Sequence, residues 1–169
     1  MKKYTSVISI LLIILTTNNS FANAYYQFVV FFNVGSALDK LTIETPTAEG
    51  SECMAIWAVP KPSVTLDRDN PLLEVTIEDR NGLANCNGDE KKNTWTYKLQ
   101  KGGDIYTGKF TFRHYSSSGW KTKIDGMKLY MSAYCMSKNN EQYRCDKQPA
   151  PIAESDSITI ISPSYGIIY

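Results

Sequence analysis

Apolar and polar side chains alternate with a period of two along most of the chain from residue 25 onward. The first such segment, residues 25–34, has one wholly apolar face and one mixed face. A period of two predicts a β-strand, and a strand with little polar character on either face belongs near the middle of a sheet. The apolar face is formed by Tyr26, Phe28, Val30, Phe32 and Val34.

The same alternation recurs in several shorter segments, and turn-forming pairs separate many of them. The predicted further strands are 40–44, 53–59, 73–78, 94–99, 106–113, 127–134 and 157–160, with 166–169 as a last edge strand. The turn pairs are Asn81-Gly82, Asn87-Gly88, Gly102-Gly103, Ser118-Gly119 and Asp125-Gly126. Short strands at this spacing predict an all-β fold, which we expect to be an antiparallel two-sheet sandwich of about eight or nine strands. A closed β-barrel is the alternative.

Three segments lack the alternation and are predicted to be loops within one domain rather than linkers between domains. They are 46–50, 60–71 and 148–155. No window carries a sustained helical stripe, although a short helix near Ala37 or across residues 139–144 remains open.

The segment before residue 25 has the pattern of a secretory signal peptide. Two lysines precede a nine-residue stretch, 7–15, that is apolar apart from one serine. A bilayer span needs roughly 20 apolar residues, and the polar residues 16–20 prevent an extension of this stretch into the next one. Ala22-Asn23-Ala24 fits the small-x-small cleavage pattern. We therefore expect residues 1–24 to be removed by cleavage after Ala24, and the mature chain to carry no membrane span.

The mature chain, residues 25–169, is expected to form a single all-β domain that is periplasmic or extracellular. It has 145 residues, which is 169 less 24, and losing two of the 18 basic residues leaves 16 against 17 acidic ones, a net charge of −1. A nearly neutral chain of mixed charge lacks the basic surface that nucleic acids require. Nucleic acid is therefore excluded as a partner.

Four cysteines agree with export to an oxidising compartment. No pair has the CxxC spacing of a zinc site and the single histidine is distant in sequence, so neither a metal nor a cofactor is expected. Three pairings are open to four cysteines. We expect the disulfides Cys53–Cys86 and Cys135–Cys145, because each joins segments that are close in the chain.

Catalytic motifs are scarce. The sequence contains no G-x-S-x-G, H-E-x-x-H, phosphate-binding loop or dinucleotide fingerprint. His114 lies close in sequence to three serines, 116–118, but it also continues an apolar strand face, which predicts a histidine at the edge of the core. No catalytic residue is assigned.

Acidic residues offer two further hypotheses. Adjacent carboxylates, Glu78 with Asp79 and Asp89 with Glu90, are the residue types of a glycoside hydrolase, but their place in or beside turns favours solvated side chains. The stretch LDRDN, 66–70, carries oxygen ligands for calcium, yet it lacks the glycine and the distal glutamate of an EF-hand loop. An Asx turn is the simpler interpretation.

The aromatic segment HYSSSGWKTK provides the candidate binding residues. Rigid aromatic side chains beside small polar ones make good contact surfaces for proteins and sugars. We assign this role to Tyr115, Ser117, Trp120 and Lys121. The alternative for Trp120 is a lid over the core.

These features favour an exported, non-catalytic binding or interaction protein that recognises an unidentified protein or carbohydrate partner through its loop aromatics. The short leader and the Lys/Asn/Ile/Ser-rich composition are typical of a bacterial source. One alternative is a small secreted hydrolase using carboxylates or His114. Another is a surface or pilus assembly subunit, because the apolar C-terminal segment 157–169 would offer an open sheet edge for strand exchange.

Overall fold

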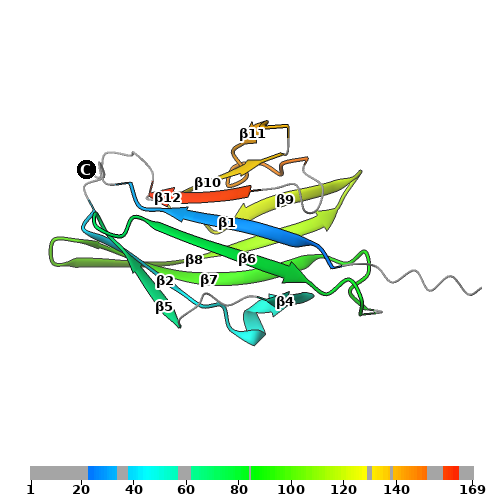
Figure 1. Ribbon diagram of the computed structural model, residues 1–169, viewed down its shortest axis with the longest axis horizontal. Helices are drawn as coiled ribbons and strands as arrows, with labels where there is room; N and C mark the ends of the chain where they lie inside the picture. Colours follow the sequence, from blue (N-terminus) through cyan, green and yellow to red (C-terminus); the bar gives the residue numbers. More distant parts are fainter. Residues whose placement is uncertain are drawn as a thin grey trace, which may run out of the picture.

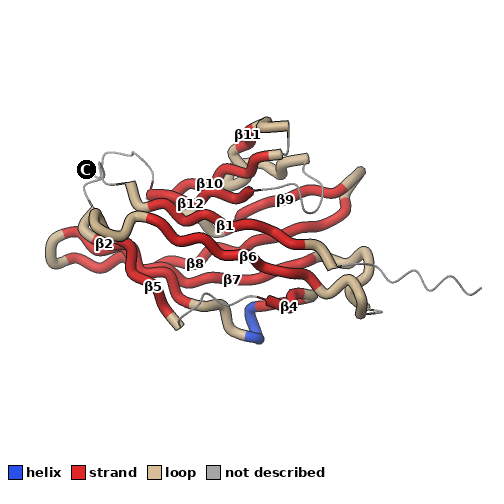
Figure 2. The backbone as a smooth tube through the Cα atoms, viewed as in Figure 1, coloured by secondary structure: helices blue, strands red, loops and turns tan. Residues whose placement is uncertain are grey.

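The computed structural model describes residues 23–33, 38–56, 62–83, 85–128, 131–137, 139–151 and the backbone of 158–163. Within these ranges all regular secondary structure is strand, apart from one short 3-10 turn, η1 (Ala48–Gly50) (Figure 2). The strands form two separate sheets, so the fold is the predicted sandwich and not the closed barrel.

The first sheet has the strand order β11-β10-β12-β1-β6-β4 (Figure 1). Its strands, in chain order, are β1 (Tyr25–Phe31), β4 (Met54–Ile56), β6 (Leu72–Asp79), β10 (Met131–Met136), β11 (Gln142–Tyr143) and β12 (Ile158–Pro163). The second sheet has the order β5-β2-β7-β8-β9, and β3 pairs with the start of β7. Its strands are β2 (Lys40–Glu44), β3 (Ser51–Glu52), β5 (Ser63–Leu66), β7 (Lys91–Lys101), β8 (Asp104–Ser116) and β9 (Trp120–Asp125).

The core lies between the two sheets and consists of the inward positions that the alternation predicts. Strand β1 lies between β12 and β6, which confirms its predicted place inside a sheet. Its buried residues meet aromatic rings from the second sheet: the ring centroids of Phe28 and Phe112 are 5.2 Å apart, and those of Phe28 and Trp95 are 6.0 Å apart. The other large, fully buried side chains of the core include Tyr26, Phe32, Leu41, Ile43, Leu66, Ile77, Tyr97 and Phe110.

Strand β12 departs from the antiparallel expectation. It runs parallel to β1 and antiparallel to β10, so it is hydrogen-bonded on both sides. In Figure 1 this red strand lies beside β1. Residues 158–163 therefore do not present the open edge on which the strand-exchange hypothesis depends. The predicted edge strand 166–169 lies outside the described residues.

Several local predictions are wrong. Strand β5 lies within the predicted loop 60–71 and pairs with β2. Strand β11 takes part of the segment 139–144, where a helix was left open. Of the predicted strand 127–134, residues 127 and 128 are not in a strand while 131–134 belong to β10, and β9 was not predicted at all. These strands are short or polar, and whether such a segment forms a strand depends strongly on its cross-strand and same-face neighbours. The segment near Ala37 lies outside the described residues.

Both predicted disulfides are confirmed. Cys53 bonds to Cys86 with their Cα atoms 5.4 Å apart, and Cys135 bonds to Cys145 with a Cα separation of 5.7 Å. In the part of the chain that the structure describes, no helix is long and apolar enough to cross a membrane.

Candidate functional site

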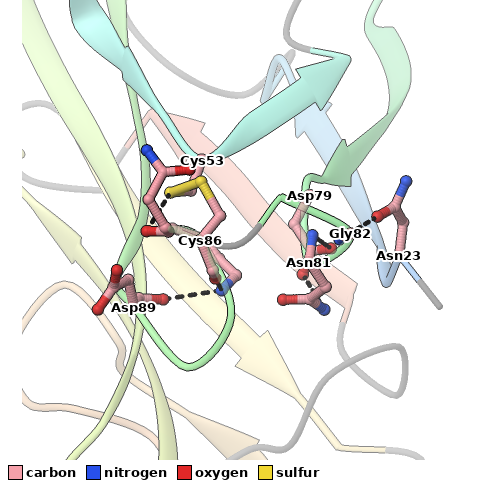
Figure 3. Close-up of a disulfide and its surroundings, with 9 residues drawn as sticks. Asn23, Cys53, Asp79, Asn81, Gly82, Cys86 and Asp89 are labelled. Atoms are coloured by element: carbon pink, nitrogen blue, oxygen red, sulfur yellow. Dashed lines mark hydrogen bonds between the residues drawn. A yellow bond between two sulfur atoms is a disulfide. The ribbon is translucent and has the colours of Figure 1, made fainter. Parts of the chain in front are cut away.

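One end of the sandwich gathers three segments that are distant in sequence. The β6–β7 loop, residues 80–90, lies there because β6 ends at this point and β7 begins. The tip of the β8–β9 hairpin lies at the same end, because the start of β7 pairs with the end of β8, with Lys91 opposite His114. Cys53 joins the loop through its disulfide to Cys86 (Figure 3). We call this region the disulfide end.

Two hollows open at the disulfide end. The larger has a volume of about 560 Å³ and lies against the disulfide. It is lined by Glu52, Cys53, Arg80, Leu83, Asn85, Cys86, Asp89 and Glu90. The smaller, about 240 Å³, is lined by Asn23, Arg80, Gly82 and Leu83. Since Arg80 and Leu83 line both, the hollows adjoin each other, and Leu83 is 47% exposed between them.

A buried lysine holds the β6–β7 loop in place alongside the disulfide. Lys91 is fully buried, and its Nζ donates hydrogen bonds to the carbonyl oxygens of Cys86, at 2.5 Å, and Asp89, at 2.8 Å. The Nζ also lies 5.6 Å from the centroid of the Trp120 ring, within the range of a cation–π contact. The loop that lines the larger hollow is thus constrained covalently and by hydrogen bonds.

The charges around the larger hollow are partly neutralised by ion pairs. Glu52 pairs with Lys92 at 2.7 Å, from β3 to β7. Glu90 pairs with Arg113, which also contacts Asp125 at 3.1 Å. Hydrogen bonds from Arg113 to these two carboxylates raise the pKa of Arg113 above its usual range. The lining of the hollow is therefore mixed, with carboxylates and the guanidinium of Arg80 beside the apolar surface of Leu83 and the disulfide.

Beneath the hairpin tip the core is polar. His114 is fully buried, its Nδ1 lies 2.9 Å from Thr122 Oγ1, and its ring stacks on Trp120 with centroids 4.8 Å apart and an interplanar angle of 5°. Its Nε2 has no hydrogen-bond partner among the described residues. Burial, together with the positive charge of Lys91, lowers the pKa of His114 to about 4, so the imidazole is neutral at pH 7.

The four predicted binding residues do not converge on one surface. Trp120 continues the inward positions of β9 and is half-buried over His114, as the lid alternative requires. Tyr115 and Lys121 are cross-strand partners on the outer face, where Arg113 Cζ lies 5.2 Å from the Tyr115 ring centroid. Ser117 is exposed at the tip, where its N–H donates to Gly119 O.

Most of the acid–base candidates are not brought together either. Asp89 and Glu90 are the exception, because both line the larger hollow. His114 is bonded to Thr122, while the serines 116–118 are exposed at the tip. Asp79 is buried, whereas Glu78 occupies the opposite face of β6. The described residues contain no cluster of three or more side chains suited to a metal ion.

The stretch LDRDN forms the predicted Asx turn. Asp67 Oδ1 accepts hydrogen bonds from the N–H groups of Asp69, at 3.0 Å, and Asn70, at 2.9 Å. The backbone hydrogen bond from Asn70 is the largest cause of a lowered Asp67 pKa. The Asp67 carboxylate therefore has a structural role in this turn.

Sequence reasoning missed several residues of the disulfide end, above all Lys91, Arg80 and Leu83. A signal for Lys91 was present, because it shares the inward parity of Asn93 and Trp95, so extending the alternation by two residues would have buried it. The loop residues carry no comparable pattern. No protein-family model, curated protein or solved structure matches the chain. The functional argument therefore depends on the chemistry of this end of the molecule.

Proposed function

We propose that this protein is an exported, non-catalytic binding module, of bacterial origin, that recognises a protein or glycan partner at its disulfide end. The observation that carries the proposal is the pair of adjoining hollows on a loop held by Cys53–Cys86 and by Lys91. A site that is already ordered loses little conformational entropy when a ligand binds, and this favours recognition by a fixed surface.

The residue types around the hollows suit a polar partner with some apolar character. Carboxylates and the Asn85 amide accept hydrogen bonds from hydroxyl or amino groups, Arg80 donates to acceptors, and Leu83 offers apolar contact. Tyr115 and Lys121, on the outer face of the β8–β9 hairpin, and Ser117, at its tip, lie at the same end of the sandwich and offer further contacts, while Trp120 covers His114 on the inner side. Such mixed composition is typical of binding surfaces for proteins and sugars.

Export is supported by the leader pattern of the first 24 residues and by the two disulfides. The proposed destination is the periplasm or the cell exterior. The buried, neutral His114, bonded to Thr122, gives no support to a histidine-assisted hydrolase.

A matched pair of charge substitutions tests the location of the site. Leu83→Asp places a carboxylate between the hollows, whereas Ile105→Asp makes the same kind of change at the opposite end, where Ile105 is 67% exposed. Wild type and both variants are tested on a glycan array and against immobilised envelope-protein fractions, and melting curves check folding. We expect Leu83→Asp to weaken capture at least tenfold, or about 1.4 kcal/mol, while Ile105→Asp binds as wild type does. Equal binding by all three proteins would contradict the proposed site.

A further inference from the structure

Asn23 is integrated into the folded sandwich, although the leader pattern places it before the cleavage site. Its side-chain Nδ2 donates to Glu78 Oε1 at 2.8 Å, and its Oδ1 accepts a hydrogen bond from the Gly82 N–H at 3.3 Å. Figure 3 shows the second of these contacts, at the turn that follows β6. Both contacts tie the residue to segments more than 50 positions away in the chain.

Ala24 is integrated more deeply. It is only 6% exposed, its N–H donates to Asp79 Oδ1 at 2.9 Å, and its carbonyl accepts from the Asp79 N–H at 3.0 Å. Asp79 is fully buried, and its other carboxylate oxygen accepts from the Tyr26 hydroxyl at 2.9 Å. A buried carboxylate is tolerated when several donors satisfy it. Ala24 supplies one of these donors.

The sequence offers two cleavage sites with small residues at the positions read by signal peptidase. Ala22 and Ala24 fit cleavage after residue 24, and Ser20 and Ala22 also fit the small-x-small pattern, for cleavage after residue 22. Only the second leaves Asn23 and Ala24 on the mature protein. We infer that the leader is removed between Ala22 and Asn23, so that the mature chain begins at Asn23; this inference rests on the proposed export.

The chemistry is hydrolysis of one peptide bond by a signal peptidase. Water supplies a hydroxyl to the Ala22 carbonyl carbon and a proton to the Asn23 nitrogen. The leader then ends in a carboxylate and the mature chain starts with an α-ammonium group. Because Asn23 is one of the four residues lining the smaller hollow, processing also adds a positive charge to the residue that forms part of its wall. Cleavage after Ala24 would remove that residue.

The direct test is the N-terminus of the exported protein. The full chain is expressed in a secreting bacterial host, purified from the periplasm or medium, and analysed by intact mass and N-terminal sequencing. A start at Asn23 supports the inference. A start at Tyr25 overturns the cleavage site and leaves export intact, whereas a chain in the membrane fraction that still begins at Met1 overturns both.

Substitutions in the leader test which of the two cleavage sites signal peptidase uses. Ser20→Leu blocks the small-residue position of the inferred site but leaves the Ala22 and Ala24 positions unchanged, and Asn19→Leu is the matched control one residue upstream. We expect Ser20→Leu to slow processing or shift it to Tyr25 in a pulse-chase experiment, while Asn19→Leu is processed as wild type is. Normal processing of Ser20→Leu would overturn the inference.

A stability measurement separately tests whether Asn23 and Ala24 belong to the mature fold. Chains that begin at Asn23 and at Tyr25 are each released from a fusion by a protease that leaves no extra residue, and both disulfides are formed. The shorter chain lacks the four hydrogen bonds described for Asn23 and Ala24. We expect its Tm to be lower by roughly 5 to 10 °C. Equal melting temperatures would overturn the argument that these two residues belong to the mature fold.

Discussion

The two ends of strand β8 obey the same alternation but have opposite characters. At its start the strand leaves a tight turn at Gly102-Gly103, where Gly102 has a φ of +58°, and its first inward residue, Tyr106, is only partly buried against the core. At its other end His114 is fully buried, and its cross-strand partners Lys91 and Thr122 are buried too. The inward positions thus change from apolar residues in mid-strand to polar residues at the disulfide end.

The difference shows that the buried polar interactions of β8 are concentrated at the disulfide end. The Gly102-Gly103 turn needs only a residue that tolerates a positive φ. The disulfide end instead buries polar groups, and most of their polar atoms have partners: Thr122 for His114 Nδ1 and two loop carbonyls for Lys91. Among the described residues His114 Nε2 has none. Buried polar networks of this kind rigidify a region when they are satisfied. The hollows therefore lie on the more constrained end of the sandwich.

Removing the loop disulfide is expected to have the largest effect. The double substitution Cys53→Ala with Cys86→Ala opens a link between residues separated by 33 positions, and the chain-entropy model predicts a loss of about 4 kcal/mol in the free energy of unfolding. Urea denaturation measures this loss. Ile105→Ala, at the other end of β8, serves as the control and should change stability by less than about 0.5 kcal/mol. A loss below about 1 kcal/mol for the double variant would remove the contrast between the two ends.

Trp120→Ala is expected to have the next largest effect. The ring is half-buried over His114 and Lys91, so its loss uncovers the polar end of the core and should cost about 3 kcal/mol, the lower end of the range for buried aromatics. Tyr115→Ala, on the outer face of the same hairpin, should cost about 1 kcal/mol or less. Chemical denaturation of both variants distinguishes the faces. Equal losses would show that Trp120 is not a lid.

Acidification provides a third test. The pKa of His114 is about 4 in the fold and about 6.5 in the unfolded chain, so the unfolded state binds more protons as the pH falls. The stability associated with neutral His114 is complete above pH 6.5 and declines between about pH 6.5 and 4, with about 2 kcal/mol lost at pH 5. Unfolding measured from pH 7 to 4 should show this slope in wild type. The slope should be smaller in His114→Phe, which keeps the stacked ring, and identical slopes would refute the shifted pKa.

Arg113→Gln should have the smallest effect. Arg113 joins Glu90 to Asp125 near the larger hollow, but its side chain is 36% exposed, and exposed ion pairs contribute little. We expect a loss of less than about 1 kcal/mol, smaller still at high salt because ions screen the pairs. Denaturation at low and high ionic strength checks this. A loss above about 2 kcal/mol at both salt concentrations would mean that Arg113 is as important to this end as the buried groups are.

Residue order alone was enough to predict many local features of the fold. The period of two identified the central strands and their core faces, as for Tyr26, Phe28 and Val30 in β1 and for Trp95 and Tyr97 in β7. Local patterns suffice here because successive side chains in a strand point to opposite faces wherever the strand is placed. Short sequence separation also favoured the two disulfides that the structure contains.

The tertiary structure, in contrast, establishes which segments lie beside one another. Strand β12 is placed between β1 and β10, and the β6–β7 loop is placed beside the β8–β9 hairpin, through pairings that no local pattern encodes. It also decided that Trp120 covers His114 while Tyr115 faces outward, which divides the predicted binding residues between two faces. Alternation shows that a strand has two faces. Which face is covered, and by which distant segment, follows from the order of strands in the sheets and from the packing of one sheet on the other.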